Sequence, residues 1–171
     1  MEQLNYNGQP PGYVLSPAEV VNYVENHDNQ TLYDLNVFKL PLGTSTAERA
    51  RVQILAAALT AFSQGIAYFH AGMELLRSKS MDRNSFDSGD WFNRIDWSAT
   101  DSTWGSGLPP RTDNEAKWVY MTPLLADPAL EPAPDDLDAA TTAAAELLEI
   151  RFSSPLFRLG TADRIQARID F

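Results

Sequence analysis

The chain of 171 residues is 44% hydrophobic, which is enough for one globular domain with a core. Its formal net charge of −10 argues against a binding surface for nucleic acids or anionic membranes, because such a surface needs clustered Lys and Arg. The absence of cysteine excludes a disulfide framework and a thiolate metal site. Its start, MEQLNYNGQPPGYV, lacks the pattern of a signal peptide, and no apolar run reaches the roughly 18 residues of a membrane span. We therefore expect no membrane partner and leave a secreted or a cytoplasmic location open.

The first predicted element is a short strand over residues 19–24. Its sequence, EVVNYV, is a β-branched and aromatic run that favours a buried strand over a helix. The polar sequence HDNQ follows at 27–30, and residues 29–44 end in Pro41 and Gly43, which indicates a loop. The strand therefore leads directly into a set of polar side chains.

The next two elements are a helix over 46–64 and a second strand over 66–72. Ser45, followed three residues later by Glu48, predicts a capping box at the start of the helix. The helix is apolar almost all round after its first turns, so we expect most of its circumference to be buried. Gly65 ends the helix, and the short apolar run IAYFHAG predicts the second strand.

Histidines and an aspartate follow these two strands. A helical crossover joins parallel strands, whose carboxyl ends lie at the same edge of the sheet, and this edge is where α/β proteins gather their chemistry. His27, Asp28 and His70 all fall at such ends. The alternative is that Asp28 caps a turn and that each histidine is a half-buried polar residue with its own structural partner.

Residues 73–113 form a long loop that contains Trp91, Trp97 and Trp104 among aspartates and small polar residues. Aromatic faces beside carboxylates and amides suit sugar recognition, because a pyranose ring offers a flat C–H face and a rim of hydroxyls. The alternative is a self-packed loop whose tryptophans cover the edge of the core, and we expect this for at least one of the three.

Regular structure resumes near the end of the chain. Helix formers and apolar residues predict a helix over 137–153, which Pro155 ends. The sequence from 157 onward indicates the opening of a further domain. No internal repeat, phosphate-binding loop, metal-ligand cluster or nucleophile elbow is found in the sequence.

Several motifs, in this order along the chain, resemble one family: YVENHDNQTLYD, QGIAYFHAGMELLRSKS, DRNSFDSGDWFNRIDW, WGSGLPP and RFSSPLFRL. They are similar to consecutive stretches of the pullulanase and limit-dextrinase group, the starch-debranching enzymes of the α-amylase superfamily. The resemblance extends from about residue 12 to residue 171. The His-Asp pair is shared across the superfamily, whereas LRSKS, SGDWFN and WGSGLPP are more specific to the debranching group.

The resemblance implies an α/β fold, the C-terminal part of a (β/α)₈ TIM-type barrel. Residues 1–155 would belong to the barrel domain, and residues 156–171 would begin a C-terminal β-sandwich. The implied barrel elements are strand seven at 19–28, its helix at 46–64, strand eight at 66–72, an elaborated loop at 73–136 and the last helix at 137–153.

The implied reaction is hydrolysis of α-1,6-glucosidic linkages in pullulan, amylopectin or limit dextrins with retention of configuration. Its nucleophile and its acid/base come from the fourth and fifth strands of the family's barrel, which this sequence does not contain. Asp28 matches the carboxylate that stabilises the transition state, and His27 matches a histidine that binds the same sugar. Arg83 and Asn84 are further candidates for substrate contact, although family members commonly carry Asp at the position of Asn84. His70 is expected to support the barrel rim.

The implied partners are an α-glucan substrate and the remaining N-terminal part of the same polypeptide. No metal site or cofactor is evident in the chain, and calcium elsewhere in the parent protein is left open. The isolated chain is expected to be inactive and to self-associate, because two strands cannot close a barrel. Two alternatives remain: a glucan-binding module without catalysis, and another specificity of the superfamily, such as that of an isoamylase or an α-amylase.

Overall fold

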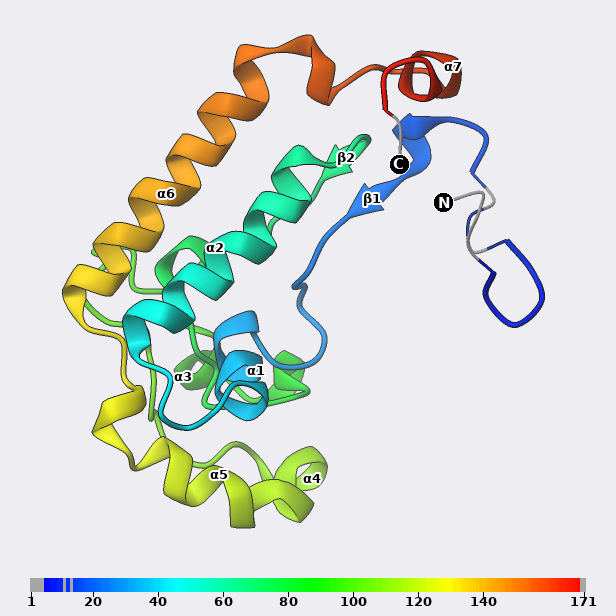
Figure 1. The fold of residues 1–171 in the computed structure, drawn as a ribbon. Helices are drawn as coiled ribbons and strands as arrows, with labels where there is room; N and C mark the ends of the chain where they lie inside the picture. The colour runs from blue at the N-terminus through cyan, green and yellow to red at the C-terminus, as the bar shows by residue number, and fades with distance from the viewer. Residues whose placement is uncertain (1–4, 11, 13, 170–171) are drawn as a thin grey trace.

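A computed structural model describes residues 5–10, 12 and 14–169 of the chain (Figure 1). It consists mostly of helices, with one small sheet. The strands are β1 (Val21–Asn22) and β2 (Ile66–Ala67), and the helices are α1 (Leu32–Lys39), α2 (Thr46–Phe62), α3 (Asp90–Asn93), α4 (Arg111–Asn114), α5 (Trp118–Leu125), α6 (Pro134–Ser153) and α7 (Ala162–Gln166). Short 3₁₀ helices are η1 (Pro17–Glu19), η2 (Met73–Leu75), η3 (Ser85–Asp87), η4 (Glu115–Lys117), η5 (Pro128–Leu130) and η6 (Pro155–Phe157).

The two strands pair in parallel, with Val21 opposite Ile66, which confirms the predicted strand, helix and strand with a parallel connection. Both strands are much shorter than predicted, and the expected burial of the first is wrong, because Val21 is 48% exposed. In the described part of the chain the sheet has two strands, so each strand keeps an edge without a neighbour. Gly65 enters β2 at φ +92°, and a Cβ there would lie 2.8 Å from the Val20 carbonyl oxygen.

Helix α2 begins at the predicted capping box. The Glu48 amide donates to Ser45 Oγ over 3.3 Å, and the Ser45 amide donates to Glu48 Oε2 over 2.9 Å. The helix packs against α1 and α6 and runs alongside α6 in Figure 1. The expectation that most of its circumference is buried is wrong: Leu55 and Leu59 are 63% and 64% exposed, because no described element covers that face.

Helix α1 lies in the stretch that the sequence analysis assigned to a loop, so that expectation is wrong. Thr31 caps the helix by accepting a hydrogen bond from the Asp34 amide over 3.3 Å. A Thr followed three residues later by an acidic residue is a known start signal for a helix, and residues 32–39 contain no Gly or Pro. These signals could have predicted α1.

The main hydrophobic core lies between α1, the segment after η2, α5 and the start of α6. Tyr33 is fully buried, its hydroxyl donates to the Leu130 carbonyl oxygen over 2.9 Å, and its ring meets Trp104 edge to face at 5.9 Å between centroids. Further core side chains are Val37, Leu76, Met81, Met121 and Leu137. The segment 75–82 is therefore a fixed part of the core although it belongs to neither a strand nor an α-helix.

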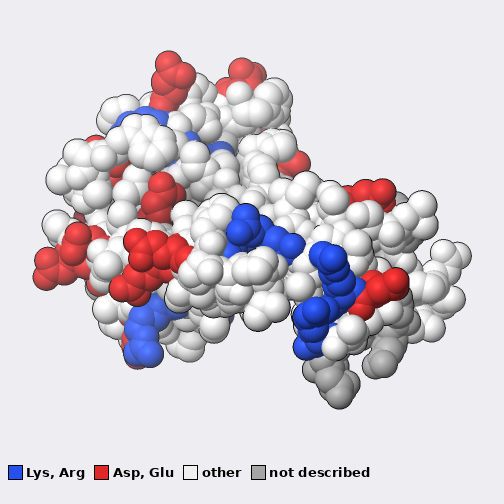
Figure 2. All heavy atoms as spheres, turned by 90° about the horizontal axis from the view of Figure 1, so that it is seen from above, with Lys and Arg blue, Asp and Glu red and all other residues white. Residues whose placement is uncertain are grey.

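The predicted last helix is present as α6, and it begins at Pro134, three residues earlier than expected. Residues 156–169 contain most of η6 and all of α7, and the proposed domain boundary between 155 and 156 stays a prediction. On the face shown in Figure 2, acidic side chains are spread over several elements and basic ones lie in separate groups. Within the described ranges, no helix has the length and hydropathy to cross a membrane.

Candidate functional site

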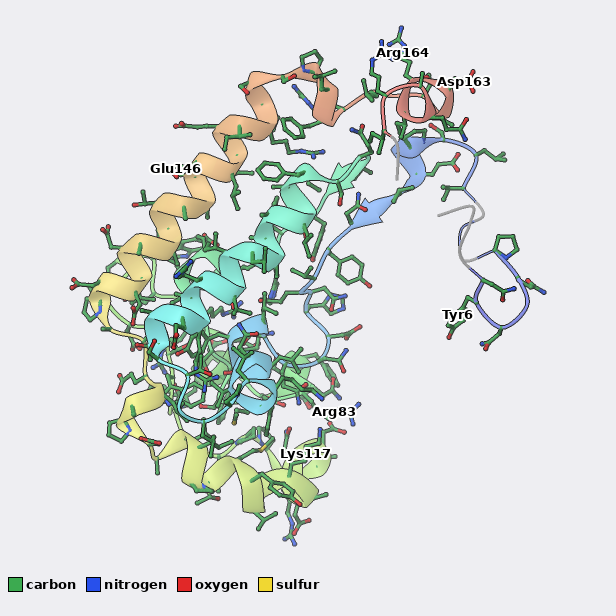
Figure 3. The ribbon with its side chains drawn as sticks, viewed as in Figure 1. Tyr6, Arg83, Lys117, Glu146, Asp163 and Arg164 are labelled. Carbon is green, nitrogen blue, oxygen red and sulfur yellow. The ribbon has the colours of Figure 1, made fainter. Side chains whose placement is uncertain are left out.

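An open hollow of about 370 Å³ lies where three separate segments meet. Asp28 and Asn29 come from the connection between β1 and α1, Arg83 and Asn84 come from the loop before η3, and Asp113 comes from α4. Three of the four site residues predicted from the sequence thus line one hollow. Figure 3 shows Arg83 extending from the body of the molecule beside α1 and above α4.

The His-Asp pair stands at the rim with its side chains in solvent. The side chains of His27 and Asp28 are 75% and 66% exposed, and His27 Nε2 lies 3.5 Å from Asp28 Oδ1. The Asp28 amide donates to Asn26 Oδ1 over 2.8 Å, and Asn29 has a positive φ of 62°, so the chain turns sharply here. This turn leaves the carboxylate of Asp28 exposed in the lining of the hollow.

Asn84 is oriented by a residue that the sequence analysis missed. Asn84 Nδ2 donates to Asp113 Oδ2 over 2.9 Å, and this contact directs the amide nitrogen toward α4. The side-chain oxygen of Asn84 therefore remains available as an acceptor for a hydroxyl group. The 29 residues that separate Asp113 from Asn84 explain why no local motif identifies the pair.

His70 lies behind the rim and contacts a second missed residue, Glu25. His70 Nδ1 is 2.6 Å from Glu25 Oε1, and these side chains are 12% and 1% exposed. Glu25 Oε2 accepts a hydrogen bond from the Leu32 amide over 2.8 Å. Glu25 thus connects the ends of both strands to the start of α1, an arrangement that favours a supporting role for His70.

A buried carboxylate on α1, that of Asp34, holds the segment 78–81 in place. Asp34 accepts hydrogen bonds from the Ser78 hydroxyl over 2.5 Å and from the amides of Lys79 and Met81 over 2.9 and 3.0 Å. Its complete burial raises the pKa of Asp34 to about 6, since removal from water disfavours the charged form. Ser80 and Met81 both have positive φ, and Asp34 fixes the backbone around this unusual turn.

The three tryptophans of the long loop have different environments. Trp104 is 8% exposed and belongs to the core, which confirms the expectation that at least one of them packs. Trp91 and Trp97 are 60% and 68% exposed. The Arg94 guanidinium lies 4.0 Å from the centroid of the Trp91 ring, and Trp91 Nε1 donates to the Ser106 carbonyl oxygen over 2.7 Å.

No group of three or more His, Cys, Asp or Glu side chains with the spacing of a metal site is found in residues 5–10, 12 and 14–169. The polar groups of the hollow are instead two carboxylates, two amides and a guanidinium. Such a set hydrogen-bonds to hydroxyl groups as donor and as acceptor. The hollow therefore suits a polyhydroxylated, uncharged ligand.

Comparison with known proteins identifies relatives over nearly the whole chain. Residues 99–171 match the family described as "Alpha-1,6-glucosidases, pullulanase-type, C-terminal". "Pullulanase 1, chloroplastic" from Arabidopsis thaliana is 48% identical over 170 residues, and "Pullulanase" from Klebsiella pneumoniae is 43% identical over 169 residues, each covering 99% of this chain. The chain is homologous to the pullulanases. The resemblance read from the sequence motifs is thereby confirmed.

Solved pullulanase structures show the same arrangement of elements. The Klebsiella pneumoniae pullulanase complexed with maltotriose matches 94% of this chain with a TM-score of 0.86 and 41% identity. The pullulanase complexed with maltotetraose from Anoxybacillus sp. LM18-11 matches 92% of the chain with a TM-score of 0.62 and 29% identity. The present chain spans 18% of the Arabidopsis sequence and 15% of the Klebsiella pneumoniae sequence, which is less than a fifth of either relative.

Proposed function

We propose that this chain is part of a debranching glycoside hydrolase that cleaves α-1,6-glucosidic linkages in pullulan, amylopectin or limit dextrins. The observation that carries the proposal is the 48% identity to a pullulanase over 170 residues, a range that includes the residues of the hollow. The polar lining of the hollow agrees with a glucan ligand. A relative in complex with maltotriose adds to this support.

Within this proposal, β1 and β2 are strands seven and eight of a (β/α)₈ barrel, and α2 and α6 are the helices that follow them. The parallel pairing of the strands and the packing of α2 beside α6 support this assignment. Residues 1–155 are then the end of the barrel domain, and residues 156–171 begin a C-terminal β-sandwich. The rest of the same polypeptide is the partner that closes the barrel.

The proposed reaction proceeds with retention at the anomeric carbon. A nucleophile and an acid/base from the remaining polypeptide act on the two sides of the scissile bond. Asp28 faces the same sugar, and its exposed carboxylate stabilises the positive charge that develops on the ring in the transition state. His27 hydrogen-bonds to that sugar, while Arg83 and the acceptor oxygen of Asn84 bind neighbouring hydroxyls.

The decisive experiment is to incubate the full-length protein with pullulan and to analyse the products. Release of maltotriose, with β-anomer absent from the first products, supports α-1,6 hydrolysis with retention. Cleavage of linear amylose and not of pullulan would replace the proposal with another specificity of the superfamily. Absence of hydrolysis by a folded full-length protein that still binds glucan would support a binding module instead.

A further inference from the structure

Asp82 and Asn114 form a buried pair, and their sequence neighbours Arg83 and Asp113 line the hollow. Asp82 is 0% exposed and Asn114 is 1% exposed. Asn114 Nδ2 donates to Asp82 Oδ1 over 2.9 Å, although 32 residues separate the two in the sequence. Neither side chain lines the hollow, which is formed by their neighbours Arg83, Asn84 and Asp113.

The pair holds the backbone of both predicted sugar-binding residues of this loop. The Asn84 amide donates to Asp82 Oδ1 over 2.9 Å, and the Arg83 amide donates to Asn114 Oδ1 over 3.2 Å. Each of these consecutive amides thus has its own buried side-chain acceptor. The exposed Arg83 and the partly buried Asn84 therefore both start from a backbone that is held by hydrogen bonds.

The same pair fixes the opposite wall of the hollow. Asn114 Nδ2 also donates to the Pro110 carbonyl oxygen over 2.9 Å, which closes the single turn of α4 that carries Asp113. Asp82 Oδ2 accepts a hydrogen bond from the Ser88 hydroxyl over 2.5 Å, which ties the end of η3 to the same carboxylate. One buried pair therefore sets the distance between the loop that carries Arg83 and Asn84 and the turn that carries Asp113.

We propose that Asp82 and Asn114 are positioning residues for glucan binding, acting through the backbone of Arg83 and Asn84 and through the turn that carries Asp113. The proposal rests on the proposed function, because it assumes that the hollow binds an α-glucan. Loss of the pair leaves two partly buried amides without their side-chain acceptors and frees the loop from α4. The expected consequence is weaker glucan binding with little change in the chemical step, because the reacting carboxylates lie elsewhere.

The hydrogen-bond pattern predicts which substitutions are tolerated. In Asp82→Asn, the amide oxygen can accept from the Asn84 amide and from Asn114, and the amide nitrogen can donate to the Ser88 hydroxyl, which accepts as readily as it donates. Asp82→Ala removes all three of these contacts. Asn114→Ala removes the hydrogen bond to Asp82 and those to the Arg83 amide and the Pro110 carbonyl oxygen. Asp87→Ala is the matched control, because Asp87 lies in η3 of the same loop and its side chain is exposed.

The test compares these four variants in the full-length protein by hydrogen exchange of the peptide that covers residues 82–89 and by steady-state kinetics on pullulan. We expect faster exchange in Asp82→Ala and Asn114→Ala, with KM raised about tenfold and kcat changed by less than about threefold, as for the loss of one or two hydrogen bonds to a sugar. Asp82→Asn should keep KM within about twofold of the wild-type value, and so should Asp87→Ala. Titration with maltotriose gives the binding constants directly.

The two proposals fail in different ways. If wild-type protein neither hydrolyses pullulan nor binds maltotriose, the proposed function is wrong, and the exchange measurement still decides whether the pair holds the loop. If wild-type protein is active and Asp82→Ala leaves both KM and the exchange of residues 82–89 unchanged, the positioning role is wrong. A loss in Asp82→Asn as large as in Asp82→Ala would also overturn it, because the charge and not the hydrogen-bond geometry would then matter.

Discussion

Two ends of the molecule differ in what covers their side chains. At the sheet end, formed by β1, β2 and the outer face of α2, apolar side chains such as Val21, Leu55 and Leu59 are about half or more exposed. At the loop end, formed by α1, residues 75–82 and the start of α6, even charged side chains such as Asp34 are fully buried. The sheet and the outer face of α2 are thus exposed, whereas the irregular segment 75–82 is part of the core.

This difference follows from where each side chain finds its partners. Strands need neighbours on both edges, and β1 and β2 have only each other within the described residues. In the segment 77–82, the amides of Lys79 and Met81 donate to Asp34, and Asp82 accepts from Asn114. Among the described residues, the buried Ser80 hydroxyl has no hydrogen-bond partner. The loop end can therefore hold in place the hollow that Asp28, Arg83 and Asn84 line, whereas apolar side chains of the sheet end stay exposed.

The largest expected effect is on Asp28, whose exposed side chain lines the hollow. In the full-length protein, Asp28→Asn should lower kcat by about 100-fold or more, which corresponds to ~3 kcal/mol, because the charge of the carboxylate matters most in the transition state. KM should change much less. The melting temperature should stay the same, because the Asp28 side chain is 66% exposed and its ion pair among the described residues, with His27, spans 3.5 Å in solvent. A variant that keeps more than about a tenth of the wild-type kcat contradicts this role.

The second effect concerns the buried carboxylate of the loop end. Asp34→Ala leaves the amides of Lys79 and Met81 without an acceptor and should lower the free energy of unfolding by about 2–3 kcal/mol. Asp34→Asn should cost less than about 1 kcal/mol, because its oxygen can accept from both amides while its nitrogen donates to Ser78. Calorimetry of the full-length protein, with hydrogen exchange of residues 77–81, measures both. Equal losses in the two variants would show that Asp34 acts through its charge.

The raised pKa of Asp34 predicts that the free energy of unfolding depends on pH. The folded chain holds the proton up to about pH 6, whereas an ordinary aspartate releases it near pH 3.8. The contribution of Asp34 to stability is therefore present in full below about pH 4 and is lost as the pH rises toward 6, by at most about 3 kcal/mol. Asp34→Asn cannot titrate and should lack this loss. Parallel stability curves for wild type and Asp34→Asn between pH 4 and pH 7 would contradict the shift.

These contrasts also show what the sequence could and could not predict. The capping box of Ser45 and Glu48 and the parallel connection through α2 were predictable, because their signals are local. Helix α1 was predictable in principle from Thr31 and Asp34. The partners of Asp34 were not predictable from the sequence, because Ser78 lies 44 residues away and the contact depends on tertiary packing. The strand lengths failed for a similar reason, since the apolar pattern does not reveal whether a neighbouring strand is present.

The exposed apolar side chains of the sheet end predict that the isolated chain self-associates. Leu55→Lys combined with Leu59→Lys should shift the chain toward monomer, because charged side chains on this face oppose burial against a second copy. A matched control places two lysines at the exposed positions Ala139 and Ala145 of α6. Light scattering over a range of concentrations gives the oligomeric state. A cooperative, stable monomer of the unchanged chain contradicts this prediction.

The smallest expected effect concerns the two exposed tryptophans of the long loop, Trp91 and Trp97. If Trp91 or Trp97 stacks on glucan, maltotriose should quench or shift part of the tryptophan fluorescence of the full-length protein, because a sugar face replaces water over the indole ring. Substitution of the stacking residue by alanine should remove that change and raise KM about fivefold, as for the loss of ~1 kcal/mol of stacking. Trp104→Phe is the control, because Trp104 is 8% exposed and packs on Tyr33, where a ligand has no access. An unchanged spectrum at saturating maltotriose would assign both exposed rings to contacts with the rest of the protein instead of the glucan.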